Sequence, residues 1–224
     1  MISFPDDRLT KKAYGRILKN ARNIKNCSQE KLAQESNLGR RTIVDIETGN
    51  TVPKPVYRES FARILSNPIL EYFPQYSIEQ FPHRLKIRFQ HENEAGKHFL
   101  NGLQQKDLDS FREVFTLYQM ASYQKDGVLM LLLDEYLHTR IMNAHPDKPT
   151  RILVERYRQD YIEFFKIWIP QLNLNIALGQ HPIHIDMFQA ILEQNKDKLT
   201  QAIHAHLIHS LNDIKRIINV LETD

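Results

Sequence analysis

The stretch that decides the fold of the N-terminal part of the chain is residues 28–49, SQEKLAQESNLGRRTIVDIETG. It predicts two short helices, residues 29–35 and 40–48, joined by a tight turn at residues 37–39. Ser28 suits an N-cap, because its hydroxyl can accept a hydrogen bond from a free backbone N–H of the first turn. Gly49 and Asn50 end the second helix. Five apolar residues are spaced to share one small core: Leu32, Ala33, Leu38, Ile43 and Ile46.

Two helices in this arrangement form a helix-turn-helix, whose second helix enters the major groove of DNA. Arg40, Arg41 and Thr42 lie at the N-terminal end of that helix, where side chains reach base edges, and Asp45 follows about one turn later. Gln29 begins the first helix and is placed to bond a phosphate. We therefore expect these five residues to contact a double-stranded DNA operator. For each of them taken alone, the alternative is an ordinary polar surface residue.

Residues 15–65 resemble a helix-turn-helix of the Xre/lambda-repressor type. The resemblance rests on GRIL at residues 15–18, SQEKLA at residues 28–33, TIVDIETG at residues 42–49, and Pro53. It covers under a quarter of the chain, and Gly39-Arg40-Arg41 departs from the Ser-Arg/Gln-Ser of many relatives. The resemblance implies a transcriptional regulator. Such proteins bind symmetric half-sites as homodimers, because one recognition helix reads only a few base pairs.

Length and composition set the limits of the interpretation. A chain of 224 residues predicts one large or two small domains, each able to bury a core. A single cysteine, Cys27, excludes an intramolecular disulfide and fits a reducing compartment. No apolar run approaches the roughly 18 residues of a transmembrane helix, and the N-terminus lacks an apolar signal region. We therefore expect a soluble, cytoplasmic protein without a membrane partner.

The charge is distributed unevenly along the chain. The net charge is +3, but residues 1–67 carry +6 and residues 68–224 carry −3. The basic excess therefore accompanies the helix-turn-helix, where a polyanion would bind. All ten histidines lie from His83 onward. This separation predicts two different chemistries in the two parts of the chain.

The predicted fold class is all-α. We expect a DNA-binding domain at residues 1–67, a linker at 68–92 with a short strand at 85–89, and a helical effector-binding and dimerisation domain at 93–224. Turn and cap residues divide this last part into an antiparallel bundle of about six helices, at about 93–105, 107–124, 127–143, 150–170, 182–194 and 196–221. Residues 129–133, LMLLL, are apolar on all sides, which favours a central position for their helix.

Four residues of the bundle form a candidate metal site. Asp134 and His138 are four apart on one helix and share a face. His184 and His206 lie at equal distances on either side of a predicted turn near Asn195, so two antiparallel helices would bring them level. One carboxylate and three imidazoles suit a divalent transition metal, zinc or nickel first, with open positions for a small ligand. A metal-free bundle with a polar pocket is the alternative.

The same segments resemble the FCD effector domain of GntR-family regulators. The resemblance rests on Asp134-x-x-x-His138, on His184 with Ala190-Ile191, and on Ala202-x-x-x-His206-Leu207. It implies a helical bundle with a buried metal, and a small organic-acid effector that completes the coordination and shifts DNA affinity. GntR proteins carry a winged helix, and this chain departs from them in its DNA-binding motif. Four arginines are candidates to hold the effector carboxylate: Arg112, Arg140, Arg156 and Arg158.

Three functions are compatible with these patterns. The first is a ligand-responsive transcriptional regulator that binds its operator as a homodimer. The second is a metal-free regulator, or an antitoxin-like module whose helical domain binds a protein partner. The third is a metal-dependent hydrolase, since a site of this kind could activate water. Because no separate general base stands at a suggestive spacing, we expect the protein not to be an enzyme.

Overall fold

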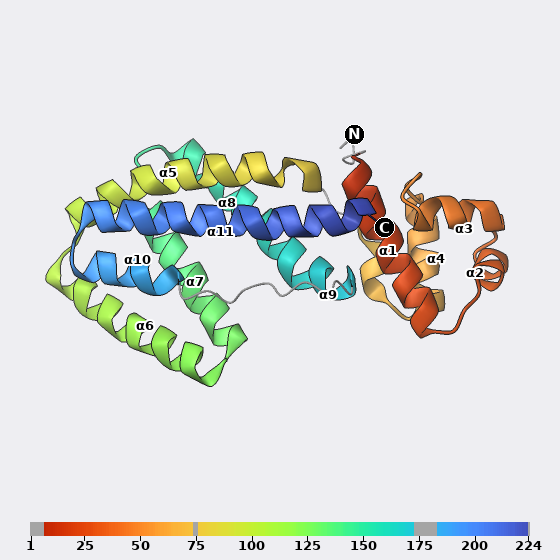
Figure 1. Cartoon of the computed structure of the whole chain (residues 1–224), viewed down its shortest axis with the longest axis horizontal. Coiled ribbons are helices and arrows are strands. Elements are labelled where there is room, and N and C mark those ends of the chain that lie inside the picture. The colour runs from red at the N-terminus through yellow and green to blue at the C-terminus, as the bar shows by residue number, and fades with distance from the viewer. Residues whose placement is uncertain (1–6, 74–75, 173–182, 224) are drawn as a thin grey trace. The chain divides into compact units, whose positions relative to one another are not determined.

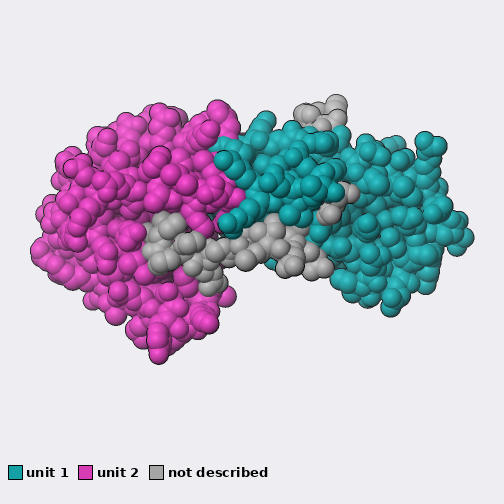
Figure 2. All heavy atoms as spheres, viewed as in Figure 1, with its two compact units in different colours: residues 1–82, 160–176, 214–224 teal, residues 83–159, 177–213 magenta. Residues whose placement is uncertain are grey.

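The computed structural model describes residues 7–73, 76–172 and 183–223. Within these ranges the chain is helical and contains no strand, which confirms the all-α prediction. It divides into two compact units (Figure 2). Unit 1 comprises Met1–Pro82, Asp160–Ile176 and Ile214–Asp224, and unit 2 comprises His83–Gln159 and Ala177–Asp213. No helix in the described ranges is long and apolar enough to cross a membrane.

Unit 1 contains the helix-turn-helix. Its helices are α1 (Arg8–Ile24), α2 (Gln29–Glu35), α3 (Arg40–Glu47) and α4 (Pro55–Leu65). Ser28 caps α2 as expected, accepting a hydrogen bond from Lys31 N at 3.0 Å. The core residues Leu32, Ile43 and Ile46 are fully buried. The sequence pattern of residues 28–49 therefore gives the expected local structure.

Two glycines allow α1 to pack closely against the end of α3. A Cβ at Gly15 would lie 2.3 Å from the backbone oxygen of Ile46, well inside van der Waals contact. Gly49 ends α3 with a φ of +75°, a conformation that L side chains rarely adopt. A Cβ there would also lie 2.8 Å from the backbone of Lys12 on α1. Both glycines are thus required by the geometry of the motif.

Segments distant in sequence complete unit 1 around α1. They are η1 (Pro68–Glu71), η2 (Ile78–Gln80), the π-helical turn η3 (Phe164–Trp168), α9 (Ile169–Leu172) and the end of α11 (Lys196–Thr223). The hydroxyl of Tyr14 donates to Leu70 O at 2.7 Å, and the Arg16 guanidinium donates to Leu172 O at 2.9 Å. Trp168, expected in a core or dimer interface, is 1% exposed.

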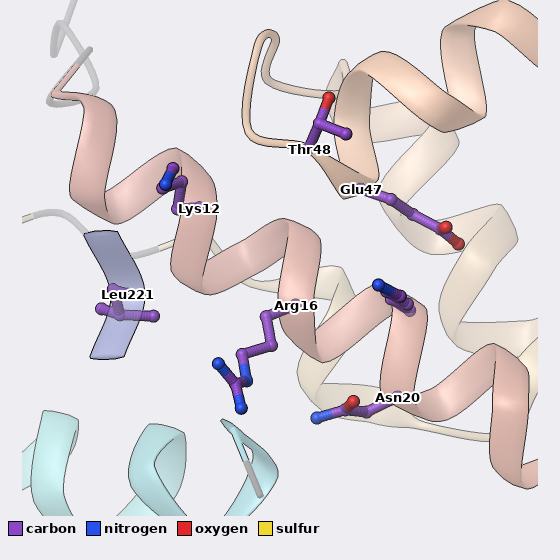
Figure 3. A pocket seen from close by; sticks show the side chains of 7 residues that line it. Lys12, Arg16, Asn20, Glu47, Thr48 and Leu221 are labelled. Atoms are coloured by element: carbon purple, nitrogen blue, oxygen red, sulfur yellow. The ribbon is translucent and has the colours of Figure 1, made fainter. Parts of the chain in front are cut away.

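Beside α1 lies a polar pocket of about 300 Å³ (Figure 3). Its basic lining includes Lys12 and Arg16 of α1, and Leu221 of α11 lies on its other side. Lys12 Nζ donates to Glu222 O at 3.1 Å, and Arg8 forms a 2.6 Å ion pair with the Glu222 carboxylate. Lys12 and Arg8 thus both contact the end of α11.

Unit 2 is built from most of α5 (Phe81–Gly102), α6 (Gln105–Gln124), α7 (Gly127–Met142), most of α8 (Lys148–Glu163), α10 (Ile183–Leu192) and most of α11 (Figure 1). Between α10 and α11, Gln194 adopts a left-handed conformation and Asn195 caps α11 through Lys198 N. The predicted antiparallel hairpin is therefore present. The residues before Ile183 that were expected to open it lie outside the described residues.

Two expectations for this part of the chain were wrong. Residues 85–89 form no strand, and residues 81–92 belong to α5 where a linker was expected. The buried residues Phe81, Leu85, Phe89 and Glu92 recur every three or four positions, which is the helical period. Pro82 is compatible with a helix because it occupies the first turn.

The apolar helix α7 is only partly central. Its C-terminal half is buried at Leu137 and Ile141, whereas Val128 and Leu132 in its N-terminal half are 73% and 56% exposed in the single chain. Leu117, Met120 and Tyr123 on the preceding helix α6 are exposed as well. The two helices thus present large apolar side chains on either side of the turn at residues 125–126.

Candidate DNA-binding surface and candidate metal centre

The five residues expected to contact DNA lie on α2 and α3. Arg40 and Arg41 are exposed at the start of α3 and make no hydrogen bond or ion pair to any residue that the structure describes. Thr42 and Asp45 are partly exposed further along the helix. Gly39 precedes α3 without a side-chain cap, so backbone N–H groups and two guanidinium groups share one end of the helix. This end suits contact with phosphates and base edges.

Gln29 is differently engaged from what was expected. Its amide nitrogen donates to Glu47 Oε2 at 2.8 Å. The Glu47 carboxylate also accepts hydrogen bonds from Nε and Nη2 of Arg22, at 2.6 Å and 3.1 Å. A third nitrogen of Arg22, Nη1, donates to Cys27 O. This network joins α1, α2 and α3. Arg22 and Glu47 therefore fix the orientation of α3, a role that the sequence patterns did not reveal.

The four residues expected to bind a metal converge in unit 2. Asp134 Oδ1 lies 2.6 Å from His184 Nε2 and 3.1 Å from His138 Nε2, and the two imidazole nitrogens are 3.3 Å apart. The ring of His206 lies 4.5 Å from that of His184 and 5.0 Å from that of His138. The three histidines offer nitrogen atoms that all lie within 4.8 Å of one another.

These donors come from three helices. Asp134 and His138 occupy one face of α7, as their spacing predicts. His184 is the second residue of α10, and His206 lies on α11, level with it across the hairpin. Tetrahedral ligands bonded to zinc at about 2.0–2.1 Å lie about 3.3–3.4 Å from one another. The 3.3 Å between the two Nε2 atoms matches that edge, whereas Asp134 Oδ1 lies closer to them, at 3.1 Å and at the hydrogen-bond distance of 2.6 Å. The three imidazoles therefore suit a transition metal, and Asp134 would move slightly away from His184 to act as the fourth ligand.

Two further residues orient the imidazoles, and the sequence patterns revealed neither. Glu92 of α5 is completely buried and contacts His138 Nδ1 through Oε1. The Tyr118 hydroxyl of α6 lies 3.2 Å from His184 Nδ1. When each Nδ1 carries the proton toward these partners, each Nε2 directs its lone pair toward Asp134. A carboxylate behind a ligating histidine is the usual arrangement in metal sites.

The electrostatics of the cluster follow from its burial. Burial alone would raise the pKa of Asp134, but His184 and His138 hold it well below its ordinary value. Burial would likewise lower the pKa of His138, yet Glu92 and Asp134 raise it. His206 is the opposite case, because burial and the neighbouring His184 and His138 all lower its pKa. His206 is therefore neutral near pH 7, the form that binds metals.

Of the four arginines expected to hold an effector carboxylate, only Arg158 is buried and close enough to Asp134 to interact with its charge. Arg112 pairs with Asp109, Arg140 with Asp107, and Arg158 with Glu155; Arg156 is exposed. A different arginine, Arg88 of α5, is buried one turn from Glu92, with its Nε 3.7 Å from the Glu92 carboxylate. The helical spacing of Arg88 and Glu92 within an apolar stripe is the signal that could have identified both.

Comparison with known proteins concerns the N-terminal motif alone. Residues 18–57 match the family model described as helix-turn-helix. No curated protein and no solved structure matches the chain significantly. The match supports a DNA-binding transcriptional regulator. The resemblance of the C-terminal part to the FCD effector domain has no support from these comparisons.

Proposed function

We propose that this helix-turn-helix protein is a transcriptional regulator whose affinity for an operator is controlled by a small carboxylate bound at a metal centre in unit 2. The observation that carries the proposal is the convergence of Asp134, His138, His184 and His206. Three different helices contribute these donors. A buried glutamate and a tyrosine support two of the imidazoles from behind.

DNA recognition would rest on α3. Arg40 and Arg41 are exposed and uncommitted among the described residues, so they can contact phosphates or guanine edges. Thr42 and Asp45 would follow along the groove. Gln29 would approach a phosphate only through the part of its amide group that Glu47 leaves free.

The metal would be held by Asp134, His138, His184 and His206. A bound divalent ion supplies positive charge and open coordination positions for a carboxylate. Glu92 holds the His138 ring and Tyr118 holds the His184 ring, so both Nε2 atoms keep their direction before any ion enters. Without an ion, Asp134 remains ionised among these imidazoles.

A homodimer accounts for the exposed apolar residues of unit 2. Leu117, Met120, Tyr123, Val128 and Leu132 lie on α6 and α7 around a single turn. Exposed large apolar side chains grouped in this way often mark an interaction site. We assign it to a second copy of the chain, because two half-sites on DNA require two recognition helices.

Helix α11 connects the candidate metal centre covalently to the unit that contains the helix-turn-helix. Residues 196–213 of α11 belong to unit 2 and include His206, whereas residues 214–223 belong to unit 1. Within unit 1, Glu222 near the end of α11 contacts Arg8 and Lys12 of α1. A change in occupancy at His206 would therefore act on an element that also packs against the DNA-binding domain.

The DNA-binding part is tested with DNA from upstream of the protein's own coding region. Arg40→Ala and Arg41→Ala should each weaken binding, whereas Arg63→Ala, which removes the same charge from an exposed position on α4, should leave it nearly unchanged. Loss of one phosphate contact should also reduce the slope of log K against log salt by about one. Equal binding by all three variants would contradict the role of α3.

The metal part is tested by elemental analysis of the purified protein. Asp134→Ala and His206→Ala should each contain less metal than wild type, whereas His204→Ala, an exposed histidine two residues from His206, should contain as much as wild type. Equal metal content in His206→Ala and His204→Ala would refute the centre. The DNA-binding part of the proposal would then remain.

A further inference from the structure

A second group of metal-type donors lies in unit 2, on the surface side of α5. His91 and Glu94 are one turn apart on α5, and His145 follows the end of α7. His145 Nε2 lies 3.4 Å from Glu94 Oε2, and His91 Nδ1 lies 3.7 Å from the same oxygen. All three donor atoms lie within 4.8 Å of one another.

The two imidazoles of this group have unused nitrogens. His145 is 3% exposed, and its Nε2 is buried without a hydrogen-bond partner among the described residues. His91 Nδ1 is in the same condition. The rings meet edge to face with centroids 5.3 Å apart. A buried nitrogen directed at a second imidazole and a carboxylate is costly to leave unsatisfied, and a cation would satisfy all three groups.

We propose that His91, Glu94 and His145 form a second binding site for a divalent transition metal of the zinc type. Two imidazoles and one carboxylate are a common three-ligand set for zinc, with water or a small ligand in the fourth position. The edge of a tetrahedral zinc site measures about 3.3 Å, so the two donor separations that involve Glu94 are close to the required geometry.

This site is distinct from the four-residue centre. The two groups share no residue. Glu92, which contacts His138, is fully buried, whereas Glu94, two positions later on α5, is exposed. An ion here would join α5 to the end of α7, the same two helices that carry Glu92 and His138. A metal ion at this second site would therefore restrain the position of α5, and with it Glu92, relative to His138 on α7.

Binding requires one local rearrangement. The backbone N–H of Asp147 donates to His145 Nδ1 at 3.2 Å, so the neutral ring carries its proton on Nε2, facing Glu94. A metal that binds Nε2 displaces that proton, and the neutral ring then carries its proton on Nδ1. Nδ1 can no longer accept the hydrogen bond from the Asp147 amide, so that bond breaks. We therefore infer weaker binding than at the first centre, and a change in the environment of the Asp147 amide when the metal enters.

The test counts zinc ions per chain in the full-length protein, stripped with a chelator and then dialysed against a zinc buffer. Wild type should bind two ions, and His145→Asn and Glu94→Gln one each. His98→Asn, an exposed histidine on the same helix, should bind two. Glu94 is exposed, so its substitution should preserve the fold even if that of His145 does not. A wild-type count in both Glu94→Gln and folded His145→Asn would overturn the proposal.

The two sites are separated by combining variants. His206→Asn should bind one ion, and His145→Asn with His206→Asn none. If His206→Asn kept the wild-type count while Glu94→Gln lost an ion, the first centre would fail and the second site would stand. A zinc-dependent shift of the Asp147 amide resonance that is present in His206→Asn and absent in Glu94→Gln provides an independent readout. An unmoved amide at full occupancy would contradict the assigned ligand atom of His145.

Discussion

Substitution of Gly15 by alanine probes the packing on which the orientation of the recognition helix depends. The new Cβ would lie 2.3 Å from Ile46 O, 2.8 Å from Glu47 O and 2.9 Å from Glu47 C. All three are backbone atoms of α3, so no side chain can rotate away. Ordinary contact begins near 3.4 Å, so α1 and α3 would have to separate by about an ångström.

The expected cost follows from two opposing contributions. Overpacking of this kind costs typically about 3 kcal/mol at its upper end, and alanine in a helix gains about 1 kcal/mol over glycine. The net loss should therefore be about 2 kcal/mol in the stability of the helix-turn-helix, together with weaker DNA binding. A chain of two units need not unfold in one step, so the loss is best measured by native-state hydrogen exchange of α1 and α3 amides.

Two glycines provide matched controls. A Cβ at Gly39 would have Thr42 Oγ1 at 3.9 Å as its nearest neighbour, and one at Gly102 would have nothing within 4 Å. Their alanine variants should change the opening free energy of α1 by less than about 1 kcal/mol. If Gly15→Ala changed it no more than these controls, the close approach of α1 and α3 would be refuted.

Three other perturbations test individual contacts. Glu47→Gln should lower the free energy of unfolding by about 2 kcal/mol, because it removes the charge from a nearly buried pair with Arg22 that is joined by two hydrogen bonds. Glu35→Gln, whose pair with Lys31 is exposed, should lower it by under about 0.5 kcal/mol. Equal losses of stability in urea unfolding would contradict the network around Glu47. Glu92→Gln should weaken metal binding at the first centre about 10–100-fold, measured by isothermal titration calorimetry. Glu113→Gln, at an exposed position, should leave the affinity unchanged. Unchanged affinity in Glu92→Gln would show that His138 does not need its buried partner. In metal-free protein the pKa of His206 is lower in the folded state than in the unfolded state, where it is about 6.5. The stability that His206 contributes is therefore complete above pH 6.5 and is lost as the pH falls toward the folded pKa, so the free energy of unfolding of wild type should fall relative to that of His206→Asn by up to about 1.4 kcal/mol per pH unit below 6.5. Parallel stability curves for the two proteins would contradict this.

Local geometry explains what could be predicted from the sequence. The helix-turn-helix follows from caps and apolar spacing within residues 28–49, and the structure has the same helices. The proximity of Asp134 and His138 needs only the helical period. His184 and His206 needed one further element, the turn near Asn195, and the equal arms of that hairpin brought them level. Metal binding by these residues stays a prediction.

Contacts between distant segments could not be derived in this way. Glu92 and Tyr118 reach the histidines from α5 and α6, and no sequence spacing encodes how those helices pack on α7 and α10. The helical start of α5 was hidden by Pro82 and by an alternation at residues 85–89 that also fits a strand. The return of α11 to α1 brings together residues as far apart in sequence as Arg8 and Glu222, which no local pattern encodes.

The most direct test of the central claim is the affinity for operator DNA of metal-stripped and metal-reloaded protein, measured at one salt concentration with and without a small carboxylate. We expect the affinity to change about fivefold or more on reloading or on addition of the carboxylate, the lower end of ordinary coupling between sites. Neither treatment should alter the affinity of His206→Asn for DNA. Equal affinity in every state of a wild-type chain that demonstrably binds the metal at His206 would contradict the central claim.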